Sequence, residues 1–308
     1  MTLTPWLWAV FTVIAAFAQT LRNAMQRELT GGLGTVGATH VRFLFGFPFA
    51  LVFLAAVLVA TASTLPRPGL AFWPWVIGGA FAQIAGTALM LAAMGERSFV
   101  VTIAYIKTEP IQVAIFGLLV LGDAVTWPML TAIIVATAGV VIMSVKALPL
   151  RPRKPGSEGS GLGGIRPTLL GLAAAAMFAL SATGFRGAIL QLHMTNYVAA
   201  ATFTLTVALA MQAASLSLYL LRSPSVPWAI VYAWRPSLFA GFLGAFASQF
   251  WFLAIALASA ASVRTLALIE VLFAQIIAYF AFGQRTTARE ALGMVLVVAG
   301  VALLLWSR

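Results

Sequence analysis

Two stretches of the sequence place charged side chains inside long apolar runs. The hexapeptide YIKTEP, from Tyr105 to Pro110, lies within the apolar residues 99–121, and Glu270 lies in a similar run of the second half. An ionised side chain at the centre of a bilayer costs roughly 2.5–3.5 kcal/mol on insertion scales. Lys107, Glu109 and Glu270 therefore need a buried partner or a polar cavity, and all three are candidate binding residues.

Polar side chains at a similar depth in other apolar runs are candidates for the same site. Helical spacing places Gln83, Thr87 and Met90 on one face, and Tyr105 is followed at the same spacing by two polar residues. The predicted substrate-binding residues are Gln19, His40, Gln83, Thr87, Met90, Tyr105, Lys107, Glu109, Gln112, Ser248, Gln249, Trp251 and Glu270.

The charges in YIKTEP have two interpretations. In the first, Lys107 forms an ion pair with Glu109 or Glu270 that only fastens helices together. Residues two apart on a helix point to different faces, so the pair with Glu270 is easier to build. In the second, the three residues line a cavity, and Pro110 bends the helix there because it cannot donate a hydrogen bond to Ile106. A freed carbonyl in a membrane is best tolerated beside a cavity.

Three further arginines, Arg22, Arg42 and Arg264, lie close to the ends of apolar runs. We expect their side chains to extend toward the lipid head groups. Arg186 lies within an apolar run and receives no assignment from the sequence.

The composition predicts an integral membrane protein that is all α-helical. Hydrophobic residues make up 62% of the 308 residues and charged residues 8%, whereas soluble domains are about 45–50% apolar. A spanning helix needs roughly 20 apolar residues. The ten predicted spans are 5–26, 37–60, 70–94, 98–121, 125–146, 167–191, 196–221, 228–257, 260–282 and 286–307.

The sequence also argues against several classes of function. The chain has no cysteine, and it contains no HExxH, GxSxG or paired Asp motif and no nucleotide-binding GxxxxGK[ST] loop. We therefore expect no enzyme, no metal and no cofactor. The net charge is +11, but the basic residues lie singly at span ends and in one central cluster, as in membrane proteins. Nucleic acid is therefore not an expected partner.

The spans form two similar halves. A Pro-, Gly- and Arg-rich linker at 147–166 separates five spans in residues 1–146 from five in residues 167–308. A shift of 161 positions superposes Glu109 on Glu270, Gly122 on Gly283, and the AGV of 138–140 on that of 299–301. Five is an odd number, so the second half enters the membrane in the opposite sense. The prediction is an inverted repeat around a central cavity.

The distribution of basic residues predicts the orientation in the membrane. Loop Lys and Arg residues concentrate on the cytoplasmic side of membrane proteins. The side of the linker carries Arg27, Arg97, Lys146, Arg151, Arg153, Lys154, Arg166, Arg222, Arg235, Arg285 and Arg289, and the other side carries Arg67 and Arg308. The linker is therefore predicted to be cytoplasmic and both termini periplasmic.

Several short motifs resemble a known family. THVRFLFGFPFALVFLA at 39–55, and LGD and FGQ before the two AGV helices, resemble the drug/metabolite transporter superfamily and its ten-helix EamA-type exporters. The first three spans look most like a bacterial amino-acid exporter. The positions that match are Arg42, Glu109 with Pro110, and the glycines at 122 and 283. Val271 stands where the first half has Pro110.

This resemblance implies a basket of ten helices in a bacterial inner membrane that exports aromatic and other neutral amino acids, or related metabolites, by alternating access. The alternative is proton-coupled efflux of drugs or cationic compounds, with Glu109 or Glu270 exchanging a proton. The expected partners are a small-molecule substrate and the lipid bilayer. A monomer is expected, and a dimer stays open.

Overall fold

The computed structural model describes residues 6–96, 102, 105–144, 166–222, 234–273, 275–276 and 287–306. Within these ranges the regular elements are all helices, in agreement with the predicted all-α class. In the described part of the chain, six helical segments are long and apolar enough to cross a membrane: Val36–Ala60, Phe72–Met94, Arg166–Gln191, Tyr197–Leu220, Ser237–Leu257 and Ala288–Trp306. Shorter apolar helices cover Leu7–Arg22, Glu109–Leu121 and Trp127–Met143.

The first helix is longer than the sequence predicted. Helix α1 runs through Leu7–Leu44, and a kink at Gly34 divides it. Gly34 has φ +67°, a conformation that residues with a Cβ rarely adopt. Helix α2 follows directly as Gly46–Ala60, and α3 covers Phe72–Glu96. The predicted loop between the first two spans is thus a kink within helical chain.

Two elements depart from regular α-helix in the middle of a predicted span. Helix α5 covers only Glu109–Phe116 and continues as the π-helix Gly117–Leu121. In the second half, α11 covers Ala260–Leu266 and continues as the 3-10 helix Ala267–Ile269.

The other helices are long and several have side-chain caps. They are α6 (Trp127–Ser144), α7 (Arg166–Gln191), α8 (Tyr197–Leu220), α10 (Trp234–Leu257) and α13 (Ala288–Trp306). The Asn196 side chain accepts hydrogen bonds from the first amides of α8. Thr287 and Glu290 bond reciprocally at the start of α13. This capping box satisfies amides that have no partner within the helix.

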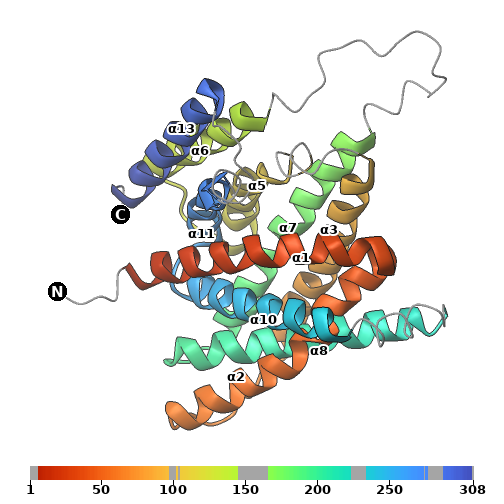
Figure 1. The fold of residues 1–308 in the computed structure, drawn as a ribbon. Coiled ribbons are helices and arrows are strands. Elements are labelled where there is room, and N and C mark those ends of the chain that lie inside the picture. The colour runs from red at the N-terminus through yellow and green to blue at the C-terminus, as the bar shows by residue number, and fades with distance from the viewer. Residues whose placement is uncertain are drawn as a thin grey trace.

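Helices of the two halves pack against each other (Figure 1). Helix α1 lies along α10, α3 along α7, α6 along α13, and α2 contacts α8. The α6–α13 pair depends on small residues, because a Cβ at Gly139 would lie 2.6 Å from the Gly293 carbonyl oxygen. The small residues of α6 and α13 therefore allow these two helices to pack closely within one chain.

Part of the predicted organisation falls outside the described residues. Residues 145–165, which include nearly all of the predicted linker, and Gly283 are not described.

Candidate functional site

The chain leaves helical geometry at the charged residues of YIKTEP. Lys107 and Thr108 form a turn, and α5 begins at Glu109 with Pro110 in its first turn. Proline is well suited to this position, because the amide that it lacks has no partner in the first turn of a helix. The prediction that Pro110 bends a continuous helix is therefore wrong, because Pro110 lies in the first turn of a new helix.

The second half breaks at the corresponding position although it has no proline there. The 3-10 turn at 267–269 directly precedes Glu270, and a shift of 161 places these residues on 106–108. Both glutamates thus follow an irregular turn within a span. Substrate and ion sites in transporters are often formed where a spanning helix departs from regular α-helical geometry.

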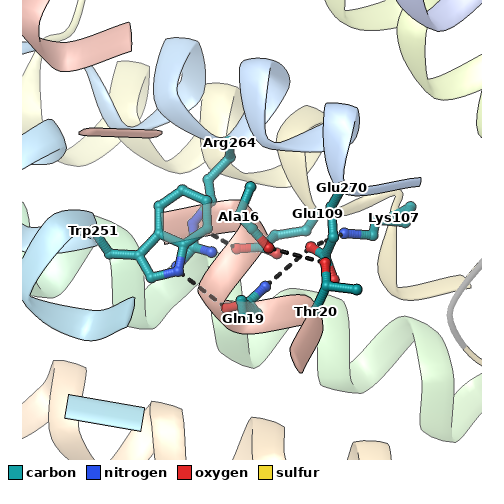
Figure 2. A network of polar contacts seen from close by, with 8 residues as sticks. All are labelled: Ala16, Gln19, Thr20, Lys107, Glu109, Trp251, Arg264 and Glu270. Carbon is teal, nitrogen blue, oxygen red and sulfur yellow. Dashed lines mark hydrogen bonds and ion pairs between the residues drawn. The ribbon is translucent and has the colours of Figure 1, made fainter. Parts of the chain in front are cut away.

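Glu270 is the centre of a polar network (Figure 2). The Lys107 Nζ lies 2.7 Å from Glu270 Oε2, and Gln19 Nε2 donates to the same oxygen at 3.1 Å. The other end of the Gln19 amide accepts a hydrogen bond of 3.0 Å from Trp251 Nε1. The predicted pair between the two halves is therefore present, and it is tied to α1 and α10.

A second ion pair crosses between the halves in the opposite direction. Arg264 Nε of α11 lies 3.1 Å from Glu109 Oε1 of α5, and the Arg264 guanidinium stacks over the Trp251 ring at 4.7 Å from its centroid. The first half thus supplies the cation of one pair and the anion of the other. Both glutamates are at least 90% buried.

These groups line a cavity of about 60 Å³ in the interior of the helix bundle. Eight of the predicted substrate-binding residues are in its wall: Gln19, Gln83, Met90, Lys107, Glu109, Ser248, Trp251 and Glu270. Ligand pockets typically measure roughly 300–1,000 Å³, whereas one water needs about 10–15 Å³. The cavity therefore has room for a few water molecules but not for a ligand of the usual size.

The remaining five predicted residues do not line the cavity. His40 Nε2 lies 2.8 Å from the Ser217 hydroxyl of α8. Gln249, one position beyond Ser248, donates to Thr202 at 2.7 Å. Thr87 stands behind the wall, where it accepts a hydrogen bond from Arg42.

Tyr105 and Gln112 leave the predicted stripe because the helix breaks between Tyr105 and Glu109. The Tyr105 hydroxyl accepts a hydrogen bond from Thr168 of α7 at 3.1 Å, and Gln112 donates to Thr108. Residues before and after the turn at Lys107 and Thr108 do not share one helix face, so helical spacing does not apply across it.

The expectation that three arginines point toward lipid head groups is wrong. Arg22, Arg42 and Arg264 all line the cavity, and the residues Arg22 and Arg42 are 4% and 7% exposed. Arg22 lies well inside the bundle because α1 continues far beyond it to Leu44. An arginine within a span is by default a candidate for function, and this signal could have identified them.

Apolar residues complete the wall, and the sequence analysis did not identify them. They are Ile106, Phe178, Ala182, Phe185, Phe252 and Ile255. Phe178, Ala182 and Phe185 come from α7, which contributed no predicted site residue. In a chain with 22 phenylalanines, residue type alone does not mark these positions.

Arg186, unassigned by the sequence, lies outside the cavity wall. It donates to the carbonyl oxygens of Ile255 and Ala258 at the end of α10 and pairs with Asp123 at 3.3 Å. Its role is to tie α7 to α10 and to the segment after the π-helix. Among the described residues no cluster of three or more His, Asp or Glu side chains could hold a metal ion.

Comparison with known proteins finds a family match in the second half of the chain. Residues 166–306, which are less than half of the chain, match the model of the EamA-like transporter family. The apolar helices, together with this match, indicate a multi-pass membrane protein.

The fold itself has a counterpart among solved structures. A structure described as "Crystal structure of protein" matches with a TM-score of 0.71 and 14% sequence identity. The match covers 98% of this chain and 95% of the other. At this identity the likeness concerns the fold alone. No curated protein matches the sequence.

Proposed function

We propose that the protein is a secondary transporter that exports small metabolites across the bacterial inner membrane by alternating access. The single observation that carries this proposal is the buried polar cavity lined by two reciprocal ion pairs between the halves. Ion pairs that only held the helices together would not need a cavity between them. Amino acids, aromatic and other neutral ones, are the proposed substrate class.

The wall has groups suited to an amino acid. Arginine forks bind carboxylates, and the two glutamates can accept an ammonium group. Phe178, Phe185, Phe252 and Trp251 form an apolar side that fits an aromatic side chain. The cavity is too small for phenylalanine in its present state, so entry requires the helices to separate. The cross-half ion pairs are the contacts that such a movement must rearrange.

The helix packing supports the proposed inverted repeat. A shift of 161 carries the start of α1 at Leu7 to 168 in α7, and carries α3 to α10. The same exchange turns the α1–α10 contact into the α7–α3 contact, and both are extensive. A pseudo-twofold relation between the halves produces this pairing, and alternating access can use it to open the cavity on either side.

The alternative, proton-coupled efflux of cationic compounds, fits the site less well. Among the described lining residues four are Arg or Lys and two are Glu, so these residues together have a formal charge of +2. A cationic substrate would be repelled by this excess.

Transport by the purified chain tests the proposal. Liposomes that contain the protein are loaded with unlabelled phenylalanine, and uptake of labelled phenylalanine by exchange is measured against protein-free liposomes. The proposal predicts uptake that the Glu270→Gln variant lacks. Equal uptake with and without the protein, for phenylalanine and for a panel of other neutral amino acids, would refute the proposed substrate class.

A further inference from the structure

The described residues of the cavity wall carry more positive than negative charge. Arg22, Arg42, Lys107 and Arg264 face Glu109 and Glu270. Each carboxylate already has a cation at close range, at 3.1 Å for Glu109 and 2.7 Å for Glu270. A neutral amino acid would bring one charge of each sign and leave the excess of +2 unchanged.

Arg42 contributes to this excess of positive charge and pairs with no carboxylate among the described residues. Its Nη1 donates to the neutral hydroxyl of Thr87 at 3.2 Å, and Thr87 in turn donates to the Gln83 carbonyl oxygen at 2.8 Å. In the described part of the chain no carboxylate forms an ion pair with Arg42. Among the described residues, the charged side chains that act on Arg42 are two cations, Arg22 and Arg264.

This arrangement is costly without an anion. Like charges repel strongly in an interior of low dielectric constant, and a buried cation is normally paired or hydrogen-bonded to an anion. Thr87 orients Arg42 without neutralising it. A guanidinium held in this way is prepared to bind a carboxylate through two parallel hydrogen bonds.

We infer that the cavity selects small organic carboxylates with a net negative charge over neutral zwitterions, and that Arg42 and Arg22 bind the substrate carboxylate. A dicarboxylate of charge −2 neutralises the excess charge of the wall. A compact anion also needs less expansion of a 60 Å³ cavity than an aromatic amino acid does. This inference rests on the proposed transport of small metabolites, and within that function it assigns the higher affinity to anionic substrates and not to neutral amino acids.

Binding of a charge series to the purified wild-type chain tests the inference. Affinities are measured by calorimetry for succinate, glutamate, phenylalanine and lysine, with net charges of −2, −1, 0 and +1, and for inorganic phosphate. We expect succinate or glutamate to bind at least about tenfold more tightly than phenylalanine, and lysine most weakly. Phenylalanine binding as tightly as both anions would overturn the inference. Phosphate binding more tightly than both carboxylates would overturn the carboxylate assignment.

Variants of Arg42 locate the binding group. Arg42→Gln is expected to weaken succinate binding about tenfold or more, and Arg42→Lys to retain part of it, because lysine keeps the charge but not the fork. Arg67→Gln, at an exposed loop position, is the matched control and leaves the affinity unchanged. Unaltered succinate affinity in a folded Arg42→Gln variant would contradict the assigned role.

The series also separates this inference from the proposed transport function. Exchange of phenylalanine in liposomes, combined with no binding of succinate or glutamate, would refute only the anion preference. Tight succinate binding without exchange of any tested solute would refute transport and leave the anion site in place.

Discussion

At the scale of single residues, Glu270 fits both interpretations of the buried charges, the ion pair between helices and the cavity wall. It accepts from Lys107 and Gln19 through one oxygen atom and also lines the cavity. An ion pair that fastens helices and a cavity wall are therefore the same structure here. A transporter can use such a pair as a contact that holds one conformation and is exchanged for substrate in another.

Removal of one partner separates stability from transport. Glu270→Gln leaves the charge of Lys107 without its counter-charge, and loss of one partner of a buried pair costs about 3–5 kcal/mol. Adding Lys107→Met removes the unpaired cation and should restore much of the melting temperature. We expect neither variant to transport. Full transport by the stable double variant would show that the pair is only a structural contact.

At the scale of elements, the paired breaks before Glu109 and Glu270 are a property of both halves. The second half forms its 3-10 turn at 267–269 without a proline, so an irregular turn before the glutamate does not require one. We expect Pro110→Ala to change the stability by less than about 1 kcal/mol and to retain transport, because this residue stands at a helix start. Loss of folding or of transport in this variant would mean that the proline itself creates the break.

The contact between α6 and α13 depends on the absence of side chains. A Cβ at Gly139 would lie 2.6 Å from a backbone oxygen of α13, and such overpacking typically costs about 1–3 kcal/mol. Gly139→Ala should therefore lower the melting temperature. Gly78→Ala is the matched control, because a Cβ at this exposed position of α3 meets nothing within 4 Å. An equal effect of both substitutions would contradict the role of this contact.

The predicted spans and site residues, set beside the structure, show what the sequence could predict. Apolar runs located the helices because a bilayer imposes length and hydrophobicity. Depth within a run also located Lys107, Glu109 and Glu270. Arg22 was misjudged because the end of the apolar run is not the end of α1, which continues to Leu44. The side chains that α7 contributes to the cavity wall depend on which helices become neighbours. The spacing of residues within one span does not contain that information.

At the scale of the whole molecule, the proposed topology places the linker in the cytoplasm and the loop at Arg67 outside. The chain has no cysteine, so a single introduced thiol reports its own position. In intact cells a membrane-impermeant maleimide should label Arg67→Cys and should not label Arg222→Cys, although both positions are exposed. The reverse labelling pattern would refute the predicted topology.

Access to the cavity from both sides tests the central claim most directly. Met90 lies in the cavity wall, and Met90→Cys places a thiol there in a chain that contains no other cysteine. Right-side-out and inside-out membrane vesicles are treated with a small impermeant thiol reagent, with and without substrate. The account predicts labelling from each side and protection by substrate in both. Labelling from one side only, or from neither, would contradict alternating access through this cavity.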